Sequence, residues 1–441
     1  MKRITITAVS FILIICMAVS LSSCKLYDYI EQSFVSKTSE EKESNGSYTE
    51  INKPSFTFSE YYTPCKNEHS YKELTNDYEK KLYDGFRESC FFVSPNKDTE
   101  GYKTKQVVIE DYLLSEAEVR IVIKAFMDDN PECFWLSSSF GYWKYDALNY
   151  TAVQVYSYLS PSEITEMQNS FVEISNELFS SIKSGLNEYE REKYVHDYLR
   201  EICTYDNDEA KTNEITNYEA YNVYGALVKN LAVCEGYSRT FEFLLSSLGV
   251  DTVCIMGSGE EQLHMWNCVL LGGDWYYVDV TWDDMENEYS VYNYLNISEE
   301  QLLDDHTISN TFDKFSEEEI CGNEEKEAAI INMFVPKCDS IAYNYFVREC
   351  AHLKDFDGAD VIDSLYEYAK DQKEYFRFYI DPEYLEFDSA VDSLFSSYPQ
   401  YFFSYIQSVN SRLAEFSIDE ENVSYGADSV RHSVTVELNY F

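Results

Sequence analysis

The sequence predicts an α+β protein in which a helix that begins at a cysteine packs with an antiparallel hairpin. After Cys234, apolar side chains recur at helical steps of three and four residues until Gly249, a residue type that commonly ends helices. Further along, two strand-like runs flank Gly272-Gly273, and such a pair is typical of a two-residue hairpin loop. A helix followed by paired antiparallel strands indicates the α+β class.

Shorter patterns place further elements on both sides of this centre. We expect strands at 104–111 and 150–159 and a helix from Ser115. Another helix should follow Ser160, where Ser-Pro-Ser-Glu has the form of a capping box with proline at the first helical position. The tail contains a strand-like stretch, a helical stretch and an alternating strand, at 373–380, 387–397 and 433–440. These patterns predict small α/β or α+β domains on both flanks of the core.

The first residues have the pattern of an export signal. Lys2 and Arg3 precede an apolar stretch, and Leu21-Ser22-Ser23-Cys24 resembles a bacterial lipobox, where the signal is cut before a cysteine that receives lipid. The alternatives are an ordinary secretory signal with a chance cysteine, or a transmembrane anchor, for which the apolar stretch is short against the ~20 residues of a spanning helix. We expect an exported protein, lipid-anchored through Cys24 at the outer face of the cytoplasmic membrane, on the cell surface.

Changes in composition divide the chain into five parts. Residues 35–54 are polar and nearly free of aliphatic side chains, which indicates a flexible tether, and a charge-rich run near residue 320 indicates another boundary. The expected parts are a lipoprotein signal peptide at 1–23, a tether at 24–55, an N-terminal α+β domain at 56–165, the domain with the Cys234 helix at 166–318 and a C-terminal α+β domain at 319–441.

The composition limits the partners of the protein. The 441 residues include 79 acidic and 34 basic side chains, a formal net charge of −45. Nucleic-acid binding needs a basic surface, so we expect no nucleic-acid partner. The twelve cysteines are irregularly spaced, with no C-x-x-C pair and no cluster of histidine and cysteine, so we expect no metal site. Outside the cytoplasm some cysteines can pair as disulfides, and the spacing does not say which.

The hairpin carries two side chains that a thiol can use. If the glycine pair forms the loop, counting back along both strands places Trp266 opposite Asp279, with His264 two residues away on the same face. A slip of one residue would send His264 to the opposite face. The favoured turn therefore places an imidazole diagonally next to a carboxylate.

These groups form a possible catalytic set with the cysteine. A thiol in the first turn of a helix lies at the positive end of the helix dipole, which favours the thiolate. An imidazole can take the thiol proton, and a carboxylate orients the ring and stabilises the imidazolium. Each residue alone has a structural explanation, but the joint arrangement is harder to obtain by chance. We therefore predict Cys234, His264 and Asp279 as catalytic residues, with some exposure of the thiol.

Three stretches carry a resemblance to a known family. The runs Y-G-A-L-V-K-N-L-A-V-C-E-G-Y, H-M-W-N and Y-Y-V-D-V-T-W-D-D resemble the transglutaminase-like superfamily, in its bacterial surface-protein branch. The resemblance covers about residues 180–310, including Asp305-His306, and residues 129–135 resemble the segment that precedes such a core. It implies a papain-like α+β fold with a Cys-His-Asp triad, whose roles fall on the three residues predicted above. The motifs specify the fold and the triad well and the substrate poorly.

Two features depart from the family pattern. Asn230-Leu231 stand where relatives often carry Gly-Lys, although asparagine also tolerates a left-handed backbone. No clear glutamine precedes Cys234 at the distance where papain-like enzymes keep an oxyanion donor. The Cys234 backbone N–H can supply one donor. The candidates for a second are Tyr221, Asn222 and Trp266.

Two functional hypotheses follow. The first is a membrane-anchored cysteine enzyme that acts on amide or peptide bonds through a thioester, by hydrolysis or transamidation, on a protein or peptide substrate at the cell surface or cell wall. The second is a non-catalytic surface adhesion or scaffold protein that uses the fold for protein binding. An intact triad favours the enzyme, because a binding module has no need of all three residues. Neither hypothesis implies a metal or an organic cofactor.

Overall fold

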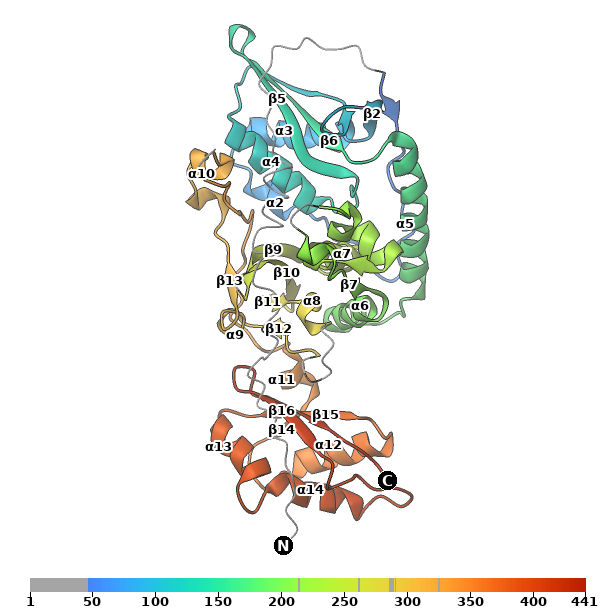
Figure 1. Ribbon diagram of the computed structural model, residues 1–441, viewed down its shortest axis with the longest axis vertical. Coiled ribbons are helices and arrows are strands. Elements are labelled where there is room, and N and C mark those ends of the chain that lie inside the picture. Colours follow the sequence, from blue (N-terminus) through green and yellow to red (C-terminus); the bar gives the residue numbers. More distant parts are fainter. Residues whose placement is uncertain (1–46, 213–214, 261, 285–288, 290, 324–325) are drawn as a thin grey trace. The chain divides into compact units, whose positions relative to one another are not determined.

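The computed structural model describes residues 47–441 except 213–214, 261, 285–288, 290 and 324–325. The described residues group into two units (Figure 1). The larger unit contains residues 47–281 and 305–338, and the smaller unit contains residues 282–304 and 339–441. Across the described ranges, no helix is both long enough and apolar enough to span a membrane.

The first sheet of the larger unit is antiparallel, with the order β1-β2-β3-β6-β4 and with β5 also paired to β6. Its strands are β1 (Thr49–Glu50), β2 (Phe92–Lys97), β3 (Tyr102–Thr104), β4 (Val107–Glu110), β5 (Leu136–Tyr145) and β6 (Tyr150–Ser157). Strands β4 and β6 confirm the predictions at 104–111 and 150–159. Helices α2 (His69–Glu73), α3 (Asp77–Ser89) and α4 (Glu116–Asp129) pack together beside this sheet.

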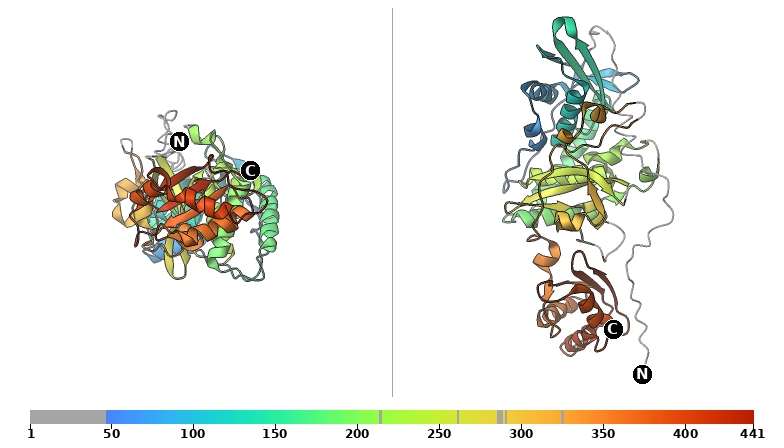
Figure 2. Two further views of the ribbon diagram at one scale, coloured as in Figure 1. Left: turned by 90° about the horizontal axis from the view of Figure 1, so that it is seen from below. Right: turned by 90° about the vertical axis from the view of Figure 1, so that its left-hand side faces the viewer.

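The predicted helix starts are confirmed with their caps. Helix α4 follows Ser115, whose hydroxyl accepts the backbone N–H of Glu118 at 3.2 Å. Helix α5 (Pro161–Ser181) follows Ser160 with a complete capping box, and it lies along one side of the unit (Figures 1 and 2). Such caps satisfy backbone N–H groups that have no partner in the first turn, which explains why local sequence predicts these positions well.

The second sheet of this unit carries the predicted hairpin. Its antiparallel strands β9 (Thr252–Gly259), β10 (Gln262–Leu271), β11 (Asp274–Val278) and β13 (His306–Ile308) lie in the order β11-β10-β9-β13. Leu271 pairs with Asp274, as predicted, and the ladder continues in the same register for the length of β11. Gly272 and Gly273 have φ values of +60° and +100°, which fit a type I′ turn. Helix α7 (Cys234–Ser247) packs against β9 and β10.

The remaining elements of the larger unit are short, apart from one helix. Helix α6 (Glu188–Ile202) packs on α7, and β7 (Thr204–Tyr205) pairs in parallel with β8 (Leu231–Ala232) immediately before α7. The short turns of helix are η1 (Asp146–Leu148), η2 (Glu209–Lys211), η3 (Tyr218–Tyr221), η4 (Gly225–Lys229), α8 (Val280–Asp283), η5 (Phe312–Lys314) and α10 (Glu317–Cys321).

The smaller unit is a second α+β fold. Strands β14 (Ala351–Leu353), β15 (Tyr375–Ile380), β16 (Ser424–Asp428) and β17 (Ser433–Glu437) form a sheet in the order β14-β15-β17-β16, with helices on one face (Figures 1 and 2). The helical segments are α9 (Glu299–Leu302), α11 (Tyr345–Glu349), α12 (Ala359–Lys370), α13 (Phe387–Val391), η6 (Asp392–Ser396) and α14 (Tyr401–Asn410), with the short strand β12 (Leu295–Ile297). The strands and helix predicted in the tail are confirmed.

The N-terminal predictions fall mostly outside the described residues. These are the signal peptide at 1–23, the lipidated Cys24 and most of the tether. Thr49–Glu50 pair with β2 and Ile51 is buried, so this part of the stretch predicted as a tether is ordered. The five-part division is finer than the two units and stays a prediction.

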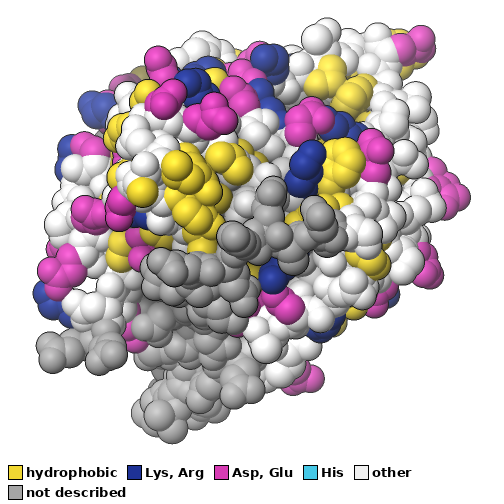
Figure 3. Space-filling model, turned by 90° about the horizontal axis from the view of Figure 1, so that it is seen from above, with side chains coloured by type: hydrophobic (Ala, Val, Ile, Leu, Met, Phe, Trp, Pro, Cys, Tyr) yellow, Lys and Arg dark blue, Asp and Glu magenta, His cyan; other side chains and the backbone are white. Residues whose placement is uncertain are grey.

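Charged side chains of both signs are mixed on the face drawn in Figure 3. Asp and Glu lie there among Lys and Arg, beside a group of hydrophobic side chains. The basic groups on this face are therefore dispersed among acidic neighbours.

Candidate active site

Cys234 is the first residue of helix α7, as the sequence predicts. The N–H of Val233 donates to the Ala220 carbonyl at 2.9 Å, so the chain around residue 220 packs against the first turn of the helix. Gly236 permits this packing, because a Cβ there would lie 2.4 Å from the same carbonyl oxygen. The thiol has the expected place at the positive end of the helix. Its residue is only 7% exposed, which is less exposure than we expect for a nucleophile.

The hairpin brings His264 and Asp279 together. Nε2 of His264 lies 2.5 Å from Oδ2 of Asp279, and both side chains are buried. Cys234 is among the groups that raise the pKa of His264, so the thiol lies near the imidazole. The contact between His264 and Asp279 is therefore as predicted, and Cys234 lies close to it.

The electrostatics of the site favour an imidazolium at neutral pH. Burial by itself would lower the pKa of His264, but the Asp279 carboxylate and the Cys234 side chain raise it to about 10. Burial would likewise raise the pKa of Asp279, but His264 and His306 hold it well below its usual range. His264 is therefore held as a cation in the region of the site.

A second histidine contacts the same carboxylate. Nε2 of His306, on β13, lies 3.2 Å from Oδ2 of Asp279, and its Nδ1 lies 2.5 Å from Oδ1 of Asp305. Burial would lower the pKa of His306, but the hydrogen bonds to the two carboxylates raise it. Strand β13 can approach β9 because Gly257 has no side chain, and a Cβ there would lie 2.0 Å from the Thr307 carbonyl oxygen.

His306 is a site residue that was not predicted from the sequence. The residue lies within the stretch that resembles the family. The sequence there shows only a histidine that follows two aspartates and begins a short run of β-branched residues. Such a run does not reveal which strand it will pair with, because that pairing joins residues about fifty positions apart. The contact with Asp279 makes His306 a candidate positioning residue for the carboxylate.

His264, Asp279 and His306 could together offer ligands to a metal ion. The ligand atoms of His264, Asp279 and His306 all lie within 4.8 Å of one another. Two imidazoles and a carboxylate are donors that zinc or iron accepts. In this structure both imidazoles contact Oδ2 of Asp279, and Cys234 is among the groups that raise the pKa of His264. The hydrogen bonds are those expected of a group that holds a proton beside a thiol.

Two of the three candidate oxyanion donors are engaged locally. The amide Nδ2 of Asn222 donates to the carbonyl of Tyr218 at 3.0 Å, and its Oδ1 accepts the N–H of Tyr224 at 3.0 Å. The hydroxyl of Tyr221 lies 3.2 Å from Oε1 of Glu209. Asn222 therefore holds a turn of its own backbone, and the Tyr221 hydroxyl holds a buried carboxylate.

Trp266 has different surroundings. Its side chain is fully buried on the same face of β10 as His264, and the two rings stack with centroids 5.8 Å apart. The indole Nε1 has no hydrogen-bond partner among the described residues. A buried N–H without a partner is uncommon, so Trp266 is the candidate that has a donor left to give.

The departure at Asn230 is accommodated as expected. Its backbone is left-handed, with φ of +59°, and its Nδ2 donates to the Ile202 carbonyl at 2.8 Å. Asparagine thus supplies the conformation for which relatives often use glycine, and it adds a contact to α6. The prediction that this turn survives the substitution is confirmed.

In a papain-like fold, a thiol lies at the N-terminus of a helix. An imidazole and a carboxylate follow it along the chain, on an adjoining antiparallel sheet. Residues 176–280 match the family model of the transglutaminase-like superfamily. This match confirms, for the core of the chain, the resemblance to the transglutaminase-like superfamily seen in the sequence. At the level of the superfamily, the match supports a cysteine-protease-like enzyme.

Solved structures with a similar fold include a TGase, at 15% identity and a TM-score of 0.25, over 49% of this chain and 60% of that one. A proposed cysteine protease from Cytophaga hutchinsonii is 12% identical, with a TM-score of 0.20, over 32% of this chain and 61% of that one. A proposed protease from Parabacteroides distasonis has the same identity and TM-score, over 30% of this chain and 29% of that one. The similarity thus spans less than two thirds of each of these chains. The search of curated proteins found no match.

Proposed function

We propose that the protein is a cysteine-dependent acyl-transfer enzyme that acts on amide or peptide bonds. The observation that carries the proposal is the position of His264, which contacts Asp279 through Nε2 and lies near enough to Cys234 for the thiol to raise its pKa. We assign Nδ1 as the ring nitrogen that serves the thiol. This is the arrangement in which a carboxylate holds an imidazole and the imidazole activates a nucleophile.

In the proposed reaction, the Cys234 thiolate attacks the carbonyl carbon of an amide and forms a carbon–sulfur bond. The imidazolium of His264 gives its Nδ1 proton to the leaving amine as the carbon–nitrogen bond breaks, which leaves a thioester. Neutral His264 then takes a proton from water, and the hydroxide releases the acid and restores the thiolate. An amine in place of water gives a new amide, which is transamidation.

The oxyanion formed in each step needs hydrogen-bond donors. The Cys234 backbone N–H is one, because the first N–H groups of a helix have no intrahelical acceptor. The Trp266 indole N–H is the proposed second, since its buried Nε1 has no partner among the residues that the structure describes.

Chemical labelling tests the nucleophile. Limited iodoacetamide at pH ~6, followed by peptide mapping, should modify Cys234 ahead of the more exposed thiols, which are Cys65, Cys254, Cys321 and Cys350. Burial is the largest of the effects that raise the pKa of each competitor, to about 11 for Cys65 and about 12 for Cys350. Equal labelling of several cysteines would mean that no thiol is activated, and the proposal would fall.

The burial of Cys234 favours a second candidate function, which is a surface adhesion or scaffold protein that uses the fold for protein binding. A thiol that is 7% exposed leaves little room for a substrate without some local movement.

A screen for reaction products separates the enzyme from the scaffold. Surface proteins and cell-wall peptides are incubated with wild type and with Cys234→Ala, and mass spectrometry seeks new cleavages or cross-links. Products that require Cys234 support the enzyme, and binding without products supports the scaffold.

We also propose that the protein is exported and held at the outer face of the cytoplasmic membrane by lipid on Cys24, where it meets protein or peptide substrates. The lipobox-like Leu21-Ser22-Ser23-Cys24 and the polar stretch behind it support this location. Cys24→Ser should release the protein from membranes or leave it as an uncut precursor. Detergent-phase partitioning of a fully processed Cys24→Ser protein would contradict the proposed lipid anchor.

A further inference from the structure

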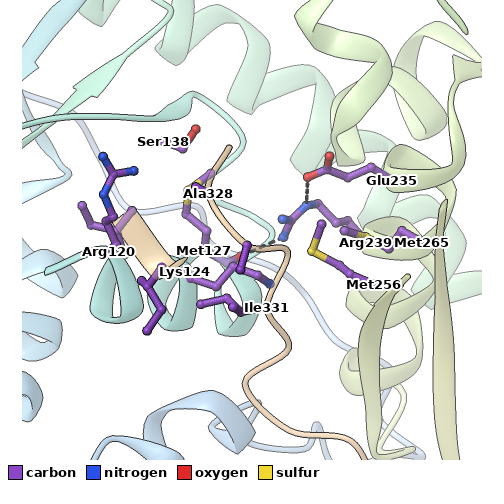
Figure 4. A pocket seen from close by; sticks show the side chains of 13 residues that line it. Arg120, Lys124, Met127, Ser138, Glu235, Arg239, Met256, Met265, Ala328 and Ile331 are labelled. Carbon is purple, nitrogen blue, oxygen red and sulfur yellow. Dashed lines mark hydrogen bonds and ion pairs between the residues drawn. The ribbon is translucent and has the colours of Figure 1, made fainter. Parts of the chain in front are cut away.

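A small apolar cavity adjoins the helix that carries the proposed nucleophile. It has a volume of about 60 Å³ and lies among side chains of α4, α7, β5, β9 and β10, together with Ile320, Ala328, Ala329 and Ile331 (Figure 4). Most of its lining is aliphatic or thioether, including Met127, Met256, Met265 and Ala328. Methionine side chains adapt their shape easily, which suits a wall that closes around a ligand.

Two buried polar atoms in the lining have unmet hydrogen-bonding capacity. Glu235, the residue directly after Cys234, accepts the Nε–H of Arg239 through Oε1 at 2.7 Å, while its Oε2 is buried without a partner among the described residues. The hydroxyl of Ser138 is also buried without such a partner. Figure 4 shows the Glu235–Arg239 pair on one side of the cavity and Ser138 on the other. Both residues are more than nine-tenths buried, so these atoms lack bulk water as an alternative.

A second cavity connects this region to the surroundings of the thiol. It measures about 30 Å³ and shares Met127, Glu235 and Arg239 with the first, and it is also lined by Tyr221 and Asn222. These last two residues follow Ala220, whose carbonyl accepts the N–H of the residue before Cys234. The two cavities therefore meet at the Glu235–Arg239 pair, one residue away from the nucleophile.

We propose that the larger cavity receives a small aliphatic side chain of the acyl donor and that Glu235 Oε2 accepts a hydrogen bond from an N–H of the same donor. This inference rests on the proposed function and names the substrate class, which is a peptide with a residue such as alanine or valine at the attacked carbonyl. The size follows from comparison with an apolar cavity of about 150 Å³, which holds benzene. A cavity less than half as large takes roughly two or three carbon atoms.

A panel of N-acetyl aminoacyl fluoromethyl ketones tests the side chain. In these probes the thiolate displaces fluoride and forms a thioether, so the labelling rate of Cys234 reports how well each probe binds. Each buried methylene strengthens binding about fourfold. The alanine probe should therefore label roughly fourfold faster than the glycine probe, the valine probe should label faster still, and the phenylalanine probe should be excluded. Iodoacetamide, which has no side chain, serves as the reference on every variant.

Two matched variants test whether the cavity causes the preference for the alanine and valine probes. Ala328→Leu fills the cavity and should abolish the preference for alanine and valine over glycine when each probe rate is divided by the iodoacetamide rate of the same variant. Ala342→Leu makes the same change at an exposed position and should preserve the preference. A preference that survives Ala328→Leu arises elsewhere and overturns the inference.

The role of Glu235 has its own test on the wild-type protein. An N-methyl alanine probe lacks the N–H and should label several-fold more slowly than its parent, because Oε2 then stays unpaired. In Glu235→Gln this difference should shrink. The failures are distinguishable. His264-dependent iodoacetamide labelling without any probe preference overturns only the subsite, whereas no labelling of Cys234 overturns the proposed function as well.

An independent observation concerns two other thiols. The sulfur atoms of Cys268, on β10, and Cys338 lie 3.7 Å apart, and both residues are fully buried. We infer that this pair forms a disulfide when the protein meets a disulfide oxidant. Each thiol loses a proton, one sulfur–sulfur bond forms, and the two electrons reduce one oxidant disulfide to two thiols. The bond would tie strand β10, which carries His264, to the end of the segment that carries His306.

Oxidised glutathione tests this pairing. After incubation and alkylation of the unfolded protein, mass spectrometry should find the Cys268 and Cys338 peptides joined, two mass units below the sum of the reduced pair. The melting temperature should rise by several degrees, because the bond closes a long loop. Cys338→Ser should lose this gain, and Cys350→Ser should keep it. Recovery of both alkylated peptides from oxidised protein overturns the assignment.

Discussion

Two antiparallel hairpins of this chain bury a cationic side chain, and they use it differently. In the β10–β11 hairpin, His264 contacts Asp279, and the nearby Cys234 side chain is among the groups that raise its pKa. In the β16–β17 hairpin, the buried Arg431 donates to Asp428 at 3.0 Å and to the Asn293 carbonyl at 2.7 Å. The guanidinium also lies 4.2 Å from the centroid of the Tyr294 ring.

The difference lies in what the charge is paired with. Arg431 is held by a carboxylate, a carbonyl and an aromatic face, which are structural partners that do not change during a reaction. His264 has a carboxylate that orients it and a thiol that can exchange a proton with it. A buried charge of the first kind stabilises a fold, whereas one of the second kind can carry chemistry. Substitutions in the two hairpins should therefore separate stability from reactivity.

The largest effect should come from His264→Ala. Without the imidazolium, labelling of Cys234 by iodoacetamide at pH ~6 should slow by roughly 100-fold, because an ordinary thiol is ionised to under about 1% there. The measurement is the second-order rate constant from peptide mapping. His264→Ala should leave the melting temperature of the smaller unit unchanged. A rate independent of His264 would leave the helix dipole as the whole effect and remove the case for an enzyme.

Arg431→Ala should produce the opposite pattern. Loss of the guanidinium leaves the Asn293 carbonyl without its donor and removes the contact with Tyr294, so the smaller unit should lose about 2 kcal/mol of unfolding free energy. Urea denaturation followed by circular dichroism measures this loss. The labelling rate of Cys234 should stay within twofold of wild type. A large drop in that rate would mean that the two hairpins are not separate in function.

His306→Gln should have an intermediate effect. A glutamine amide can still donate to Asp279 but lacks the positive charge of an imidazolium, so the carboxylate keeps part of its support. Labelling of Cys234 should slow by about tenfold, and His306→Phe, which has no donor, should slow it further. Equal rates for glutamine and phenylalanine would assign His306 a packing role only.

These expectations also show which parts of the site the sequence could predict. The capping boxes at Ser115 and Ser160 and the glycine pair at 272–273 are local signals, so the helix starts and the hairpin register were predictable. His306 was not, because its place depends on β13 pairing with a strand about fifty residues earlier. The engagement of Asn222 in its own turn and the burial of Cys234 depend on packing that spacing alone does not reveal.

The pH dependence of stability should also distinguish the buried His264 from the buried Arg431. The folded-state pKa of His264 is raised to about 10, above the ~6.5 of an unfolded histidine. Its contribution to stability is therefore complete below pH ~6.5 and is lost as the pH rises through about 10. The gap in melting temperature between wild type and Asp279→Asn should be widest near pH 6 and should narrow towards pH 10. The Arg431→Ala gap should stay constant over this range, because a guanidinium does not titrate there.

The smallest effect should come from the turn itself. Gly273 has φ of +100°, and a Cβ there would meet no atom within 4 Å, so Gly273→Ala tests backbone strain without a steric clash. The cost should be about 1–2 kcal/mol, seen as a drop of a few degrees in melting temperature. Gly272→Asn, at φ of +60°, should cost less, because asparagine tolerates a left-handed backbone. If the β10–β11 ladder holds the register, both variants should label Cys234 at the wild-type rate. A slip of one residue would turn His264 to the other face of the sheet, and Gly273→Ala would then label as slowly as His264→Ala. That result would show that the turn, and not the ladder, positions the imidazole.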